Sequence, residues 1–139
     1  MALNSATLKV GDTHEMVIVD NLTRTQIVQY AGASGDYNPL HTDEIFATQV
    51  AGYPSVFAHG MLTMGMTGRM VTDYVGDGRL LNYGGRFTSQ VFPGDSLTAI
   101  STITAVEQRD GGPVADLDVV TTNQNGVVVF SGRASAKLD

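Results

Sequence analysis

Between Gly60 and Val75 the chain reads GMLTMGMTGRMVTDYV, which is predicted to be its one long helix. Apolar side chains leave little of this helix polar, and a helix that is apolar nearly all round is usually enclosed by other elements. Gly60, Gly65 and Gly68 each lower its helix propensity by about 1 kcal/mol relative to alanine. Close approach to a sheet would offset that cost. We therefore expect this helix at the centre of the fold, with its methionines as flexible core filler.

Downstream of this helix the sequence changes to the pattern of β-strands. Runs rich in threonine, isoleucine and valine are separated by turn sequences such as Pro93-Gly94-Asp95 and Asn125-Gly126. The expected strands are residues 81–92, 97–106, 116–119 and 127–136. Hairpin-linked strands after one buried helix predict an antiparallel sheet curled around that helix, an α+β fold. Upstream, we expect a strand at 16–19 and a helix that begins at Thr23.

Composition limits the possible functions. The chain has 139 residues, which predicts one domain spanning 1–139. It has no cysteine, so disulfides, thiolate nucleophiles and zinc–thiolate sites are excluded. A net charge of −6 with only two lysines offers no basic face for nucleic acid. The start resembles no secretory signal, and no apolar run approaches the roughly 20 residues that span a bilayer. We expect a soluble, cytoplasmic protein without membrane contact.

The densest polar stretch is Ser34 to His41, which places a carboxylate and an imidazole on either side of an Asn-Pro corner. Asn38 before Pro39 fits a helix cap followed by a first-turn proline, so a short helix is expected to follow, with His41 in its first turn. A loop and a helix start can aim Asp36 and His41 at one point. Taken alone, a turn aspartate and a solvated histidine are the more ordinary interpretation.

A second candidate feature is the glycine that opens the long helix. The first N–H groups of a helix lack internal partners and favour negative charge, and a glycine lets a substrate oxygen approach them. Gly60 could therefore form an oxyanion site, although a simple helix start is an equal alternative. His59 is interpreted as a buried histidine bonded to backbone near the helix start, and His14 as a surface residue.

Several landmarks together resemble the R-specific enoyl-thioester hydratases of the MaoC type. They are DYNPLH at 36–41 followed by Ala47, AHGM at 58–61, and residues 87–97 with their FPGD turn. The likeness covers nearly the whole chain, and it is also close to the catalytic subunit of mycobacterial 3-hydroxyacyl-carrier-protein dehydratases. It implies a hot-dog fold, in which an antiparallel sheet wraps around a long central helix. It also implies a homodimer, with a heterodimer or a higher oligomer as alternatives.

The resemblance further implies roles for individual residues. Asp36 and His41 would hold and activate a water, and the Gly60 N–H would receive the thioester oxygen. Asn38 is expected to fix the loop by capping, with a direct contact to water or substrate as the alternative. No cofactor is required. Some members carry a serine in the central helix near the aspartate, and here that position is assigned to Gly68, which leaves the support of Asp36 open. The expected acyl-pocket residues are Tyr37, Tyr53, Phe57, Met61 and Leu62. Arg86, with Arg69 and Arg79 as alternatives, is the candidate for a substrate phosphate.

These observations lead to one predicted activity and two alternatives. The predicted activity is that of a (3R)-hydroxyacyl-thioester hydro-lyase, which hydrates a trans-2-enoyl-CoA or -acyl-carrier-protein thioester. A hot-dog thioesterase is less consistent with the Asp36 and His41 pair, which thioesterases generally lack. A non-catalytic acyl-binding subunit would be expected to have lost one of the two. A metal site of Asp36, His41 and His59 lacks compact ligand spacing, so no metal is expected.

Overall fold

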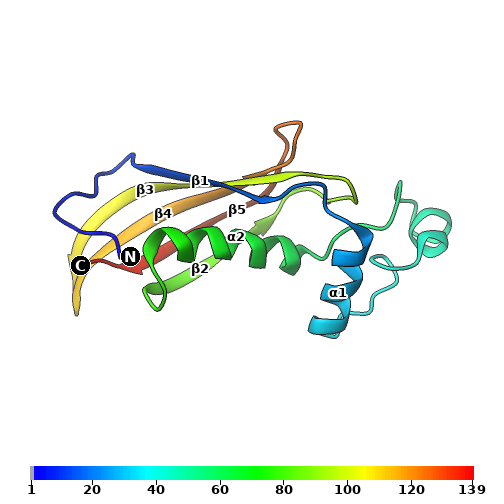
Figure 1. Cartoon of the computed structure of the whole chain (residues 1–139), viewed down its shortest axis with the longest axis horizontal. Coiled ribbons are helices and arrows are strands. Elements are labelled where there is room, and N and C mark those ends of the chain that lie inside the picture. The colour runs from blue at the N-terminus through cyan, green and yellow to red at the C-terminus, as the bar shows by residue number, and fades with distance from the viewer. Residues whose placement is uncertain (1) are drawn as a thin grey trace.

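The structure, a computed structural model, describes residues 2–139 and contains an antiparallel sheet that curves around one long helix (Figure 1). The sheet has five strands in the order β1-β3-β4-β5-β2. The elements along the chain are β1 (Thr13–Val19), α1 (Arg24–Ser34), the π-helix η1 (Phe46–Val50), α2 (Gly60–Val75), β2 (Leu80–Phe87), β3 (Leu97–Arg109), β4 (Gly112–Thr122) and β5 (Val128–Lys137). This is the α+β hot-dog arrangement that the sequence predicts.

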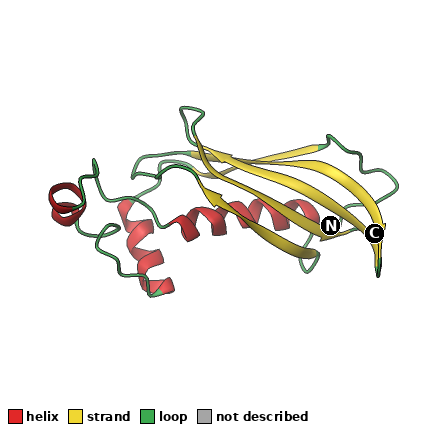
Figure 2. Cartoon of the chain, turned by 180° about the vertical axis from the view of Figure 1, so that it is seen from behind, coloured by secondary structure: helices red, strands yellow, loops and turns green. Residues whose placement is uncertain are grey.

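The core lies between α2 and the concave face of the sheet (Figure 2). Helix α2 contributes Met70, Val71 and Val75, all fully buried. From Leu97 to Ile103 on β3 every second side chain is buried, as expected for a strand with one face on the core. The largest fully buried side chain is Phe130 on β5. Burial of this kind supplies most of the stability of a domain of this size, at about 25 cal/mol per Å² of apolar surface.

Glycine in α2 permits the close packing that its low helix propensity suggested. A Cβ added to Gly68 would lie 3.2 Å from the ring of Tyr83 on β2. The Tyr83 hydroxyl donates a hydrogen bond of 2.7 Å to the carbonyl of Met64, which ties the middle of the helix to the sheet. Burial raises the pKa of Tyr83, so this phenol stays protonated and remains a donor.

Helix α1 and residues 35–57 extend beyond one end of the sheet, opposite to the end where the termini lie (Figure 1). The helix expected to begin at Thr23 begins one residue later, because Thr23 is its N-cap and forms a reciprocal capping box with Gln26. An ion pair of 2.7 Å between Arg24 and Glu44 joins the start of α1 to the segment before η1. This projecting part carries the Asp36 and His41 stretch, so the candidate site lies where it meets the start of α2.

Strand positions were predicted correctly, but several ends were wrong. The strand expected at 81–92 stops at Phe87. Thr88 still donates its N–H to the Val129 carbonyl (3.0 Å), but the chain then leaves β5, and the Val91 carbonyl accepts a hydrogen bond of 2.7 Å from the Ala58 N–H. The strands expected at 97–106 and 116–119 are longer, because β3 and β4 continue to pair up to their connecting turn at Arg109 and Gly112. None of the helices in residues 2–139 is long and apolar enough to cross a membrane.

The expectation that His14 is a surface residue is wrong. Its ring stacks on Tyr74 of α2, with centroids 4.7 Å apart and planes 8° from parallel. Its Nε2 atom is buried and has no hydrogen-bond partner in the described part of the chain. β1 alternates between exposed and half-buried side chains at this point, and His14 is on the half-buried side.

Candidate active site

The loop that carries Asp36 is shaped by local hydrogen bonds. Helix α1 ends at Gly35, whose φ of 75° is the left-handed conformation that glycine adopts without strain. The Asn38 N–H then donates to Asp36 Oδ1 (3.2 Å), and Asn38 Oδ1 accepts from the Leu40 N–H (3.0 Å). The contacts of Asn38 therefore hold the loop in shape locally.

His41 does not lie in the first turn of a helix, as the sequence had predicted. Pro39 to Thr42 form a turn, in which the His41 N–H donates to the Asn38 carbonyl (3.0 Å). Asp43 then accepts a side-chain hydrogen bond from the Phe46 N–H (3.1 Å). Because this bond caps a new helical start, the helical residues begin after Asp43 and continue as the π-helix η1.

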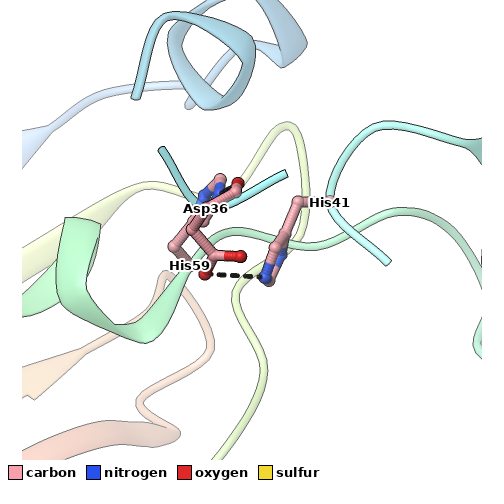
Figure 3. A group of neighbouring side chains, drawn as sticks. All are labelled: Asp36, His41 and His59. Carbon is pink, nitrogen blue, oxygen red and sulfur yellow. Dashed lines mark hydrogen bonds and ion pairs between the residues drawn. The ribbon is translucent and has the colours of Figure 1, made fainter. Parts of the chain in front are cut away.

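Asp36 and His41 approach each other without a direct hydrogen bond. The Asp36 Oδ2 atom lies 3.9 Å from His41 Nε2 (Figure 3, dashed line). That distance exceeds a hydrogen bond but allows one small molecule to contact both atoms. The two side chains differ in environment, because Asp36 is 52% exposed and His41 only 10%. The sequence prediction that both point to one place is consistent with this arrangement.

The tautomer of His41 follows from its second nitrogen. His41 Nδ1 lies 2.6 Å from the carbonyl oxygen of Phe57. A carbonyl can only accept a hydrogen bond, so Nδ1 carries the proton. In the neutral imidazole, Nε2 is then an unprotonated lone pair directed toward Asp36. This arrangement offers two acceptors, one nitrogen and one carboxylate oxygen, to whatever lies between them.

His59 is buried beneath this pair, 2% exposed, as its sequence position suggested. Its Nε2 lies 3.0 Å from the main-chain carbonyl of Asp36, and its ring stacks on that of His41 with centroids 3.8 Å apart. Burial lowers the pKa of His59 from its ordinary value of 6.5; the hydrogen bond to Asp36 opposes this shift, and the proximity of His41 adds to it. Figure 3 shows the three side chains together.

Asp36, His41 and His59 each offer a ligand atom, and these atoms lie within 4.8 Å of one another. Their composition would suit zinc, but the stacked rings do not. The lone pairs of an imidazole lie in the ring plane, and these two planes are only 25° from parallel. An ion bound by both rings would have to lie close to both ring planes, about 2.1 Å from a nitrogen of each. Two nearly parallel stacked planes meet much farther than that from the nitrogens, so the two histidines would have to separate to bind one ion.

Helix α2 begins at Gly60, the residue predicted to open it, and His59 provides no side-chain cap. Within residues 2–139 the N–H groups of Gly60 and Met61 donate to no protein acceptor, whereas those of Leu62 and Thr63 bond to the His59 carbonyl. A Cβ at Gly60 would lie 2.7 Å from the Phe87 ring, so a larger residue there would have to displace that ring. The helix start is thus a free donor at a position where glycine leaves room beside Phe87.

Gly60 lines a pocket of about 230 Å³ between the start of α2 and the segment after β2. Its other lining residues are Phe57, Ala58, Thr63, Phe87, Thr88, Ser89, Gln90, Val91 and Val129. Of the residues expected to line an acyl pocket, only Phe57 is among them. Residues 87–91 and Val129 were missed, because nothing local in the sequence shows that the end of β2 and the start of β5 pass beside Gly60.

The other expected contact residues lie elsewhere. Tyr37 and Met61 are 69% and 56% exposed, and Leu62 packs against the core. The Tyr53 ring packs on Phe57, with centroids 4.7 Å apart. Arg86 lines a separate hollow of about 460 Å³ formed by β2, β4 and β5.

The alternative arginines are engaged in structural contacts. Arg69 donates to the Ile18 carbonyl (3.2 Å), and Arg79 pairs with Asp139 (2.6 Å). Gly68, where the resemblance placed a missing serine, lies beneath Tyr83. The side chains that contact the main chain of Asp36 are instead those of its neighbour Ser34 and of the distant His59.

Comparison with known proteins places the chain in a family. The family profile described as MaoC like domain matches residues 6–125. An (R)-specific enoyl-CoA hydratase of Aeromonas caviae is 33% identical over 115 residues, which cover 81% of this chain and 84% of that protein. The solved structure of the (R)-hydratase from A. caviae, involved in PHA biosynthesis, superimposes with a TM-score of 0.82 at 30% identity and covers 96% of this chain and 98% of that one.

Longer relatives match as well. A 3-hydroxyacyl-thioester dehydratase Y of Mycobacterium tuberculosis is 39% identical over 92 residues, or 64% of this chain. This match spans only 32% of that protein's length. A separate match to an enoyl-CoA hydratase of M. tuberculosis also spans 32% of the relative's length. With its fold, its Asp36–His41 pair and the matched residues 6–125, the chain belongs to the MaoC-like domain family.

Proposed function

We propose that this chain is a hydro-lyase that reversibly adds water to a trans-2-enoyl thioester and forms the (3R)-3-hydroxyacyl thioester. The observation that carries the proposal is the pairing of His41 Nε2 with Asp36 Oδ2 at 3.9 Å, in a chain whose Gly60 N–H donates to no protein acceptor among residues 2–139. The steric course is taken from the relatives named (R)-specific. The thioester carrier is CoA or an acyl-carrier protein.

The reaction needs three groups, and Asp36, His41 and the Gly60 N–H are the groups that we assign to it. A water between Asp36 and His41 would donate one hydrogen to the carboxylate and the other to Nε2, which leaves an oxygen lone pair for the β-carbon. His41 takes the proton as the carbon–oxygen bond forms. The electrons of the double bond move to the thioester oxygen, where the Gly60 N–H stabilises the enolate. The imidazolium then gives a proton to the α-carbon, so the elements of water are added and His41 returns to its neutral form.

These contributions have ordinary magnitudes. A positioned acid–base group contributes about 10²–10⁴-fold to the rate, and one oxyanion donor about 10²–10³-fold. The His41 Nδ1–H bond to the Phe57 carbonyl keeps Nε2 free for the water, and it also stabilises the imidazolium that forms. Asp36 needs no unusual environment, because its task is to orient the water and to face the positive charge on His41.

We propose further that a second copy of the chain pairs along β2. This strand is an edge of the sheet, and Leu81 and Phe87 on it are among the exposed large apolar side chains, as is Met61 on α2. A long edge strand with apolar neighbours is normally covered in a native protein. A homodimer would be seen as twice the monomer mass by light scattering, and a strictly monomeric, active protein would reject it.

The activity is tested by the loss of enoyl absorbance with crotonyl-CoA and with a longer 2-enoyl-CoA. We expect Asp36→Asn and His41→Ala to remain folded and to lose at least ~10²-fold in kcat. Matched controls remove the same residue types elsewhere, as Asp77→Asn in the exposed turn after α2 and His14→Ala. Release of free thiol by the wild type would show a thioesterase instead. Inactivity toward CoA and carrier-protein substrates alike would favour the non-catalytic acyl-binding subunit.

A further inference from the structure

One side chain touches both members of the proposed catalytic pair. His59 contacts Asp36 through its Nε2–H, 3.0 Å from the main-chain carbonyl, and His41 through its ring face, at 3.8 Å between centroids. The ring of Tyr30 on α1 also contacts the His59 ring, in an edge-on arrangement with centroids 4.8 Å apart. The histidine is thus packed between α1 and His41 at the residue that immediately precedes Gly60.

The contact to Asp36 matters because the loop has no other distant tether. Within residues 2–139, the remaining hydrogen bonds of residues 35–38 go to neighbours in sequence, such as Gly35 to Ala31 and Asp36 to Ser34. All four residues of this loop are exposed. The bond from His59 is therefore the hydrogen bond that fixes the Asp36 main chain against the body of the protein.

The protonation state of His59 suits a supporting role. Because a carbonyl accepts at Nε2, the proton of the neutral ring lies there, and Nδ1 is unprotonated. Nδ1 is buried and has no partner among the described residues. A second proton on it would create a buried cation without an acceptor, face to face with His41, and this is consistent with the lowered pKa of His59.

We propose that His59 is the positioning residue of this site: it sets the gap between Asp36 and His41 by holding the main chain of one and the ring of the other. The catalytic meaning of that gap rests on the proposed hydratase function, whereas the holding itself does not. His59 stays neutral, contacts no substrate atom and takes no proton during the reaction. It acts only through the pair.

Two substitutions separate its two contacts. His59→Phe keeps a flat ring against His41 and removes the donor to Asp36, whereas His59→Gln keeps a donor and removes the ring. We expect each to lower kcat for crotonyl-CoA by ~10- to 100-fold, since a displacement near 1 Å costs about that much. KM should change by less than ~3-fold, because the substrate does not meet His59. Wild-type kcat in both variants would overturn the proposal.

A double variant distinguishes a positioning role of His59 from a general structural role. In a His41→Ala background, His59→Phe should change kcat by less than ~2-fold, because residues that act as a unit are strongly non-additive. A further loss as large as in the wild-type background would overturn the proposal. His14→Phe is the matched control, since His14 also has a buried, unpartnered ring nitrogen and stacks on an aromatic ring. It should leave kcat unchanged.

A measurement without substrate separates this proposal from the proposed function. Amide hydrogen exchange of residues 34–41 should be at least ~10-fold faster in His59→Phe than in the wild type, and unchanged in His14→Phe. A faster loop in a protein without hydratase activity would support the positioning role and reject the hydratase. An unchanged loop would overturn the positioning role whatever the activity. If His59→Phe does not fold, the same comparison with His59→Gln decides.

Discussion

Replacing Gly60 by alanine places a methyl group where the structure has no room. The new Cβ would lie 2.7 Å from two carbons of the Phe87 ring and 3.0 Å from a third. Carbon atoms pack at about 3.5–4.0 Å, so the ring and the start of α2 must move apart by about 1 Å. That shift moves the Gly60 N–H relative to the bound thioester oxygen.

The expected cost can be worked from the same displacement. A misplacement of 1 Å costs roughly 10²-fold in rate, and complete loss of one oxyanion donor costs about 10²–10³-fold. We therefore expect Gly60→Ala to lower kcat by ~10²-fold. Strain of about 1–3 kcal/mol is partly offset by a gain in helix propensity of up to ~1 kcal/mol, so the free energy of unfolding should fall by no more than ~2 kcal/mol.

Initial rates of crotonyl-CoA hydration and urea unfolding measure the two effects separately. Gly65→Ala is the matched control, because no heavy atom lies within 4 Å of a Cβ at that position in the same helix. It should keep wild-type kcat. Adding Phe87→Ala to Gly60→Ala removes the clash and should recover most of the lost rate. A Gly60→Ala enzyme with kcat within ~3-fold of the wild type would refute the reasoning that this N–H acts at close range.

Three further results are expected. Asn38→Ala should lower the free energy of unfolding by about 1 kcal/mol, because the hydrogen bond to the Leu40 N–H is lost. It should also lower kcat more than it raises KM. A kcat equal to that of the wild type would contradict the loop-fixing role. Tyr83→Phe should cost about 1 kcal/mol in urea unfolding by removing the bond to Met64, with kcat retained, and a large kcat loss would place Tyr83 in the site. The lowered pKa of His59 means that the unfolded chain binds its proton more readily, so its contribution to stability is complete above pH 6.5 and is lost as pH falls from 6.5 through the folded pKa. Unfolding of wild type and His59→Gln at several pH values should show a smaller acid loss in the variant, and equal slopes would contradict this assignment.

The fold was predictable where the signal is local or periodic. Helix α2 begins and ends at the predicted residues, because its apolar surface and its flanking glycine mark it within one stretch of sequence. The hairpin strands follow from alternation and from turns such as Asn125-Gly126. Their ends were less predictable, since β2 stops where a distant pairing between Ala58 and Val91 takes over.

The candidate site divides in the same way. Asp36 and His41 are close in sequence, and Asn38 between them fixes the loop with local hydrogen bonds, so one stretch carries the whole signal. The stacking of His59 on His41 brings together residues from separate segments. The walls at Phe87 and Val129 come from strand ends that are distant from Gly60 along the chain, and neither could be found without the fold.

The most direct test of the central claim compares kcat for crotonyl-CoA hydration in Asp36→Asn, His41→Ala and the double variant. If both side chains hold one water, each single variant loses at least ~10²-fold and the double variant is scarcely slower than the worse of the two. A folded single variant that keeps wild-type kcat would contradict the account. So would a double variant whose loss is the product of the two single losses.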